Sequence, residues 1–240
     1  MSAYILIGAN STICQQLIAD LDTKHSLFLL TRDTQVLPSA QCSQHHCYSV
    51  DPKNLTELLT CFQTIIQTQP TIDGVVNFPG SLLLKPAHLT TAQQWQETLA
   101  INLTTAFNAV HATAKLIKAN CQVILMSSAA ATIGLPNHEA IAAAKAGVIG
   151  LARSAAASYA AQNLRVNVIA PGLVATDLTQ PILNSAKGTA LSQSLHTLGR
   201  LGQPEHITRA LTWLLDPLND WTTGTVLTID GGLSTTKTPH

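Results

Sequence analysis

The chain has 240 residues, of which 46% are hydrophobic and only 11% are charged. This composition excludes a disordered chain, and the length is sufficient to bury a core that needs no disulfide or metal. The 13 basic residues balance the 13 acidic ones, which argues against a nucleic-acid-binding protein because such proteins carry a basic surplus.

The cysteines and the first residues indicate the compartment. The five cysteines are odd in number and include no Cys-x-x-Cys pair, so we expect reduced thiols and a cytoplasmic location. The first residues lack the basic segment and cleavage signal of a secretory peptide. No uninterrupted apolar run reaches about 18 residues, so we expect no membrane partner. Residues 140–161 come nearest, but Lys145 and Arg153 interrupt them, which is typical of an alanine-rich core helix.

Short apolar stretches alternate with longer stretches of helical spacing along the chain. The expected strands are residues 4–7, 26–30, 46–50, 72–77, 122–127, 165–170 and 225–229. The expected helices are residues 12–21, a helix opened by Asp51 and Pro52, most of 91–118, 137–161 and 203–215. This alternation predicts right-handed βαβ units. No linker divides the chain, so we predict one doubly wound Rossmann-type α/β domain over residues 1–240, with a parallel seven-stranded sheet and helices on both faces.

Ligands bind such a sheet at the carboxyl ends of its strands, so the residues that follow strands are the functional candidates. Several motifs at and beyond these positions occur in a characteristic order. They are Asn102, Ser127-Ser128, Lys145, Asn167 to Pro171-Gly172, Thr176, Gly199-Arg200 to Pro204-Glu205, and Thr223-Gly224 to Gly231-Gly232. Together they resemble the short-chain dehydrogenase/reductase family, with an overall pattern similar to 3-oxoacyl-carrier-protein reductases. The resemblance implies reversible hydride transfer between a nicotinamide cofactor and a small-molecule carbonyl or alcohol.

The resemblance also implies a four-residue proton relay, and one of its members is replaced here. Ser128, Lys145 and Asn102 match the family's serine, lysine and water-anchoring asparagine. The family tyrosine falls on Ile141, whether one counts back four residues from Lys145 or forward 13 from Ser128. Loss of a positioned general acid typically costs about 10²–10⁴ in rate. Because isoleucine transfers no proton, the usual tyrosine-dependent mechanism is excluded.

Two groups are candidates to replace the tyrosine. His138 lies three residues before Ile141, and an imidazole changes its charge near neutral pH. It shares a helix face with Lys145 if the helix already includes it; otherwise residues 137–139 are only the helix entry, with Asn137 as the cap. The second candidate is a desolvated Lys145, acting directly or through water held by Asn102. Both candidates stay open at this point.

The cofactor end keeps part of the family pattern. Of the three family glycines in the first turn only Gly8 is present, and Thr12 and Cys14 occupy the other two positions with bulkier side chains. No acid stands at Thr31 to bind a ribose 2′-hydroxyl, whereas Arg32 is placed to pair with a 2′-phosphate. We therefore expect NADP, with NAD as the alternative. The expected cofactor contacts are Gly8, Asn10, Ser11, Ile13, Arg32, Asn77, Gly80, Lys145, Pro171, Gly172 and Thr176.

Residues 42–47 contain four side chains of metal-ligand type, but we expect no metal site there. His46 and Cys47 are predicted to enter a strand, where neighbouring side chains point to opposite faces. The segment before them is expected to be a polar loop.

The departures from the family pattern gather at the functional edge of the predicted sheet, at Ile141, Thr12, Cys14, Tyr48 and Phe78-Pro79. They leave two hypotheses. The chain is an oxidoreductase with an altered proton relay, or it is a non-catalytic subunit, ligand sensor or partner protein with the same fold. The resemblance and the small residues of the alanine-rich helix imply a homodimer or homotetramer.

Overall fold

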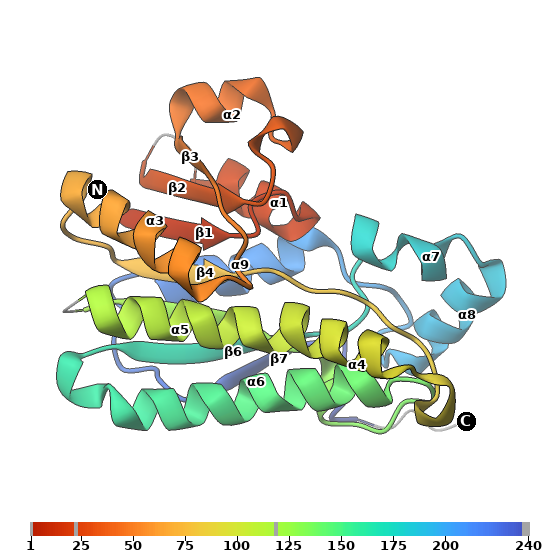
Figure 1. Ribbon diagram of the computed structural model, residues 1–240. Coiled ribbons are helices and arrows are strands. Elements are labelled where there is room, and N and C mark those ends of the chain that lie inside the picture. Colours follow the sequence, from red (N-terminus) through yellow and green to blue (C-terminus); the bar gives the residue numbers. More distant parts are fainter. Residues whose placement is uncertain (1, 22–23, 118–119, 237–240) are drawn as a thin grey trace.

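Seven strands form one parallel sheet in the computed structural model, which describes residues 2–21, 24–117 and 120–236 (Figure 1). They are β1 (Ala3–Ile7), β2 (Ser26–Thr31), β3 (His46–Ser49), β4 (Gly74–Asn77), β5 (Gln122–Met126), β6 (Arg165–Pro171) and β7 (Val226–Ile229). Their order across the sheet is β3-β2-β1-β4-β5-β6-β7, and every neighbouring pair is parallel. This is the doubly wound Rossmann order with its switch point between β1 and β4, as predicted.

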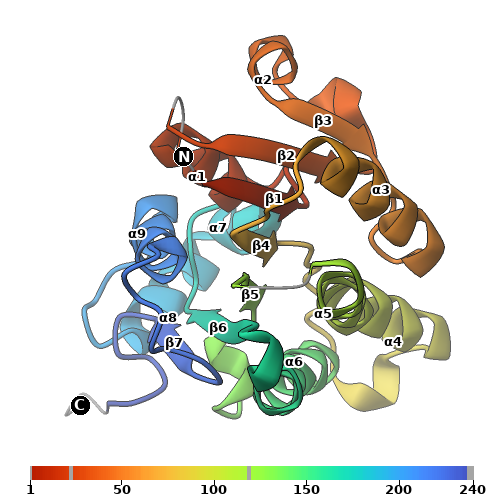
Figure 2. The same cartoon turned by 90° about the vertical axis from the view of Figure 1, so that its left-hand side faces the viewer.

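Helices cover both faces of this sheet (Figure 2). The α-helices are α1 (Thr12–Leu21), α2 (Ser39–Gln44), α3 (Leu55–Thr68), α4 (Ala92–Leu99), α5 (Thr105–Leu116), α6 (Glu139–Ser158), α7 (Gln180–Leu183), α8 (Ala186–Leu195) and α9 (Pro204–Leu215). In Figure 2, α1 and α9 lie on one face, and α3, α5 and α6 lie on the other. Helices α7 and α8 extend beyond the carboxyl ends of the strands (Figure 1).

The strands separate two apolar cores. Successive residues of β1 alternate between them: Ile5 belongs to the core under α3, α5 and α6, and Leu6 to the core under α1 and α9. This follows from the two-residue period of a strand, and it explains why strands buried on both faces are continuously apolar. Each core also contains a fully buried cysteine, Cys121 in the first and Cys14 in the second.

Helix α6 is the alanine-rich helix of the sequence. By length and composition it is the one helix in the described ranges that would suffice to cross a membrane, and half of its apolar window is buried inside the molecule. Its buried face carries residues such as Val148 and Ala152, which belong to the core. The expected start was wrong by two residues. Asn137 has a left-handed φ of 64°, so it cannot cap the helix, and His138 occupies the N-cap position.

Two other local expectations were wrong. Asp51 does not open α3; its carboxylate accepts a hydrogen bond from Lys53 N in the preceding turn, and Asn54 caps the helix by accepting from Thr56 N and Glu57 N. The segment before β3 is not a loop, because α2 extends to Gln44. Within the described residues no group of three His, Cys, Asp or Glu side chains is placed to hold a metal ion.

Candidate functional site

A cavity of about 900 Å³ opens at the carboxyl ends of the central strands. Its walls are the segments that follow β1, β4, β5 and β6, together with the start of α6 and parts of α7 and α8. Cavities of about 300–1,000 Å³ are typical of small-molecule and cofactor sites, and the switch point of a doubly wound sheet is where they form.

The cavity brings together most of the residues singled out from the sequence. Those that line it are Asn10, Ser11, Ile13, Gly80, Asn102, Ser128, His138, Lys145, Pro171, Gly172 and Thr176. Three expected cofactor contacts are not among its lining residues: Gly8, Arg32 and Asn77. Gly8 forms the turn beneath the cavity, and Arg32 is exposed at the end of β2. Asn77 is buried and ties β4 to α5 through Thr105 Oγ1.

Lys145 reaches the cavity floor from α6. Its side chain is buried, and Nζ donates a hydrogen bond of 2.9 Å to the Met126 carbonyl at the end of β5. Burial lowers the pKa of this lysine to about 8. Ser127 Oγ donates a 2.8 Å bond to the Lys145 carbonyl and so fixes α6 against the strand end. The sequence motif contained Ser127, but nothing in the sequence gave it this positioning role.

Ser128 makes a structural hydrogen bond after β5 and also lines the cavity. Its Oγ accepts a 3.2 Å bond from Ala130 N and caps the short 3₁₀ turn after β5. A hydroxyl that accepts one bond still has its hydrogen to donate. Because the side chain lines the cavity, that hydrogen is available to a substrate oxygen.

Asn102 lies in a π-helical turn between α4 and α5, a rare geometry that is frequent at functional sites. Its amide nitrogen donates to Ser81 Oγ and to the Thr98 carbonyl, and its oxygen accepts from Ser81 N. Both amide hydrogens are therefore used, one to hold the loop after β4 and the other on the Thr98 carbonyl of α4. A Cβ added to Gly80 would lie 3.5 Å from Asn102 Oδ1 and 3.8 Å from Lys145 Nζ. A side chain at position 80 would therefore occupy the space beside Asn102 Oδ1 and Lys145 Nζ.

Ile141 and His138 both face the cavity. Ile141 is 7% exposed and lies one helical turn before Lys145, so no titratable group occupies the family's tyrosine position. His138 Nδ1 is 2.7 Å from the Pro136 carbonyl. A carbonyl only accepts, so Nδ1 carries a hydrogen and the neutral ring has Nε2 as an acceptor. His138 can therefore donate a proton from Nε2 only as the imidazolium.

The first turn keeps its backbone shape with a single glycine. Gly8 has a φ of 82°, and a Cβ there would meet Pro79 Cδ at 3.0 Å, so this position needs glycine. Cys14 points into the α1/α9 core and adds no bulk to the cavity. Thr12 does line the cavity, so of the two bulkier replacements only this one changes the lining.

Thr12 joins the first turn to the segment after β6. Its Oγ1 donates a 3.1 Å bond to Asp177 Oδ2 and lies 3.3 Å from Asp177 N, which donates to it. The sequence offered no signal for this Thr12–Asp177 tie, since its partners are 165 residues apart. The tie places a carboxylate at the N-terminus of α1, on the edge of the cavity.

The residues at this end fit a dinucleotide in part. The backbone amides of Thr12 and Ile13, at the start of α1, have no acceptor among the described residues, and a helix N-terminus favours phosphate oxygens. Asn10 is held by Thr31 Oγ1 on the neighbouring strand. The carboxylate of Asp177 opposes a diphosphate there, because like charges repel. The free amides at the start of α1 therefore favour the diphosphate of a dinucleotide, and the negative charge of Asp177 disfavours it.

The strand order, with Ser128 after β5 and Lys145 on α6 beside it, is the Rossmann-type arrangement that the sequence motifs predicted. The sequence profile described as enoyl-(acyl carrier protein) reductase matches residues 26–234. The chain thus belongs to the short-chain dehydrogenase/reductase family. This confirms the family and fold that the motifs predicted.

Individual proteins show the same likeness. The chain is 29% identical over 215 residues to a 3-oxoacyl-[acyl-carrier-protein] reductase of Thermotoga maritima, covering 88% of this chain and 84% of that protein. It is 33% identical over 169 residues to the inactive 2-(S)-hydroxypropyl-CoM dehydrogenase 2 of Xanthobacter autotrophicus, covering 68% of this chain and 74% of that protein. The solved structure of ElxO with NADP bound superposes with a TM-score of 0.87 at 21% identity, covering 97% of this chain and 98% of the other.

Proposed function

We propose that this protein is a dinucleotide-dependent oxidoreductase that interconverts a small-molecule carbonyl and its alcohol through a relay lacking the tyrosine. One observation carries the proposal: a single cavity contains Ser128, Lys145 and Asn102 at one end and the free amides of α1 at the other. A serine donor, a desolvated lysine and a helix N-terminus that can bind phosphate are three of the parts that carbonyl reduction uses.

The cofactor is a nicotinamide dinucleotide, which supplies or accepts the hydride when bound. In this proposal the Thr12 and Ile13 amides hold the diphosphate, Lys145 Nζ holds the nicotinamide ribose, and the segment from Pro171 to Thr176 holds the nicotinamide. NADP is favoured over NAD because Arg32 follows β2 and no acid stands beside it at Thr31. Solved structures with this fold contain NADP in one case and NADH in another, so the choice rests on Arg32 and Thr31 alone.

Ser128 donates its free hydroxyl hydrogen to the substrate oxygen, and Lys145 supplies the proton. The burial that lowers the lysine pKa to about 8 makes its ammonium a stronger acid, so it gives up a proton more readily than a surface lysine. Because Ile141 has no proton to transfer, it does not compete with Lys145 as the donor. His138 is the alternative donor, and it acts only when its ring is doubly protonated.

The first experiment is calorimetric titration of the purified protein with NADPH and NADH. Binding of NADPH in the micromolar range, tighter than NADH, is the expected result. Carbonyl compounds of increasing size are then screened by NADPH oxidation. Absence of binding for both dinucleotides at high micromolar concentration refutes the oxidoreductase proposal.

The proton donor is identified with three variants. Lys145→Arg keeps the positive charge that holds the ribose but cannot deliver a proton at neutral pH, so it should lose reduction while keeping NADPH affinity. His138→Ala should keep activity, as should the matched control His88→Ala, whose ring is exposed and outside the cavity. Loss of activity in His138→Ala alone would instead assign the proton to His138.

A non-catalytic role is the second candidate. It is favoured by Ile141 at the tyrosine position and by the Asp177 carboxylate at the diphosphate cradle. The relative described as inactive is about as similar to this chain as the relatives described as reductases are. If neither NADPH nor NADH binds, the non-catalytic role replaces the oxidoreductase proposal, and the next experiment is a search for a partner protein.

We also propose that the chain forms one cytoplasmic domain that assembles into a homodimer or homotetramer. Trp95 on α4 and Phe107 on α5 are partly exposed aromatic side chains on adjacent helices, which suits contact with a second copy. Light scattering during size-exclusion chromatography tests the assembly, and a monomeric mass refutes it.

A further inference from the structure

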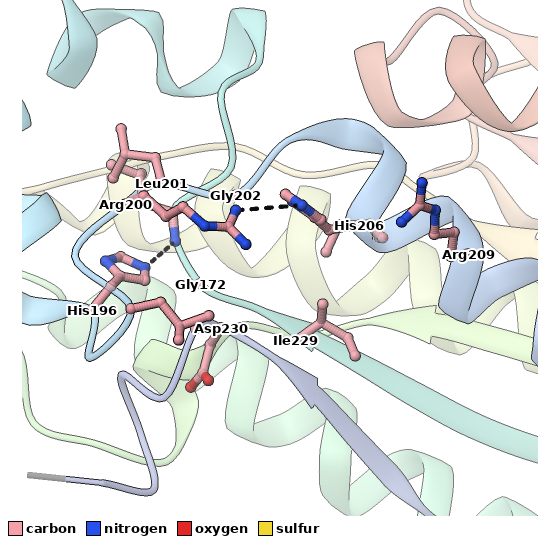
Figure 3. A pocket seen from close by; sticks show the side chains of 13 residues that line it. Gly172, His196, Arg200, Leu201, Gly202, His206, Arg209, Ile229 and Asp230 are labelled. Carbon is pink, nitrogen blue, oxygen red and sulfur yellow. Dashed lines mark hydrogen bonds between the residues drawn. The ribbon is translucent and has the colours of Figure 1, made fainter.

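A second cavity, of about 240 Å³, lies beside the first at the carboxyl ends of β6 and β7 (Figure 3). The segment from His196 to Gly202, the first turn of α9 and the end of β7 form its walls. Three residues line both cavities and separate them: Gly172, Leu173 and His196. The proposed oxidoreductase function does not use the second cavity.

Hydrogen bonds and a close contact hold the wall between the two cavities in place. His196 is buried; its Nδ1 is 2.6 Å from the Ser192 carbonyl, and its Nε2 accepts a 3.1 Å bond from Leu173 N. Both ring nitrogens are therefore engaged. A Cβ on Gly172 would lie 2.6 Å from His196 Nε2, so this contact admits only glycine. His196 supports the wall and is not available as a ligand.

Two hydrogen-bond donors face each other at the other side of this cavity. The backbone N–H of Gln203 donates a 2.8 Å bond to His206 Nδ1, which must therefore be unprotonated. In the neutral ring the hydrogen then resides on Nε2. Arg200 Nη1 lies 3.5 Å from this same Nε2 (Figure 3). An arginine has only donors, so neither group accepts from the other. Arg200 is exposed and His206 is half-buried, so water or the oxygen of a ligand supplies the acceptor for both groups.

The charge around this pair is positive. Arg209 lines the same cavity from the next turn of α9, and the N-terminus of this 12-residue helix adds a partial positive charge. Asp230 is the buried acid nearby, but its carboxylate accepts from Gly232 N and from Ser234. In the described ranges no carboxylate forms an ion pair with either arginine.

We propose that this cavity binds a small organic anion, with a carboxylate or phosphate oxygen that bridges Arg200 Nη1 and His206 Nε2 from the cavity side. Such an oxygen accepts from both groups at once, which the two donors cannot do for each other. The remaining wall is apolar, formed by Leu198, Leu201, Ile207 and Ile229. The volume is below that of sites for drug-sized ligands, so the ligand has a short apolar body.

The test is calorimetric titration of the full-length protein with butyrate and butyl phosphate, and with butan-1-ol as the uncharged control. Arg200→Gln removes the guanidinium. His206→Glu is more informative, because a glutamate at the third helical position also accepts the Gln203 N–H and keeps the cap. It replaces the free donor by an acid that pairs with Arg200. Arg153→Gln on α6 is the matched control, since that arginine is exposed and lines neither cavity.

The expected result is binding of at least one anion to the wild type and to Arg153→Gln, and binding at least about tenfold weaker for butan-1-ol and for the two site variants. Preference for butyrate or butyl phosphate identifies the head group. Unchanged melting temperature in His206→Glu shows that the variant is folded. Titration in the presence of saturating NADPH should give the same affinity, which separates this cavity from the cofactor cradle. Equal affinities in all four proteins, or no binding to the wild type, overturn the proposal.

Discussion

Restoring the tyrosine at position 141 tests whether the rest of the relay is in working geometry. Ile141 is buried at the cavity wall, and a tyrosine there shares the helix face of Lys145 one turn further on. The charge of Lys145 lowers the pKa of a neighbouring phenol, so the new hydroxyl is a competent acid near neutral pH. Ile141→Tyr should therefore create an acid beside Ser128 without any other change.

The expected gain follows from what a positioned acid contributes. General acid catalysis is worth about 10²–10⁴ in rate, or about 3–5 kcal/mol of barrier. Against this, the larger ring disturbs packing by about 1–3 kcal/mol of stability in a filled core. Here the ring extends toward a cavity of about 900 Å³, so the loss should fall at the lower end. The variant should fold and raise kcat for carbonyl reduction by up to about 100-fold, the lower end of that range, because Lys145 already supplies a proton in the wild type.

The assay is NADPH oxidation with the same carbonyl panel for wild type, Ile141→Tyr and Ile141→Phe. The phenylalanine variant has the ring without the hydroxyl, so it should stay at the wild-type rate. An equal rise in both variants would mean that ring size, not proton transfer, limits the reaction. Unchanged kcat in Ile141→Tyr, with NADPH affinity retained, would refute the reasoning about Ser128 and Lys145.

Three further outcomes follow from named contacts. Asp177→Asn should tighten NADPH binding about fivefold by calorimetry, since a unit charge about 4 Å from a phosphate contributes about 1 kcal/mol in water. Lys145 binds its proton less tightly in the folded chain, with a pKa of about 8, than in the unfolded chain, so its contribution to stability should rise between about pH 8 and 10.5 and be level outside that window. In urea unfolding, the free energy of unfolding of the wild type should rise by about 3 kcal/mol across this pH range. The Lys145→Met variant should lack this rise. Ser127→Ala should lower the free energy of unfolding by about 1 kcal/mol, because the bond to the Lys145 carbonyl is lost.

The fold could be predicted because its strands are buried on both faces. A stretch such as Ala3–Ile7 has no charged residue, and a short run of this kind between turn residues is typical of a strand between two cores. Two of the errors fell at helix starts. Asp51 and Asn54 are both good caps, and the choice between them depends on backbone angles that composition does not specify. The left-handed φ of Asn137 is a similar case.

The site could be predicted as far as motif spacing reached. Ser128, Lys145 and Asn102 were located by family spacing, and the cavity contains all three. The Thr12–Asp177 tie and the pairing of Arg200 with His206 could not be found in this way. The first depends on how two segments 165 residues apart meet in space. The second joins residues only six apart, and it depends on the path of the backbone from Arg200 into α9. The role of Arg32 stays a prediction, because its side chain lies outside the cavity lining.

The two fully buried cysteines, one in each core, allow the opening of the two cores to be followed separately by alkylation. Cys14 lies in the α1/α9 core and Cys121 in the opposite core, and burial raises the pKa of both thiols, so neither reacts with an alkylating reagent while the chain is closed. Exposed Cys42 should be modified first and serves as the reference. Equal alkylation rates at Cys14 and Cys121 would mean that both cores open in one cooperative event, whereas unequal rates would reveal two units of different local stability.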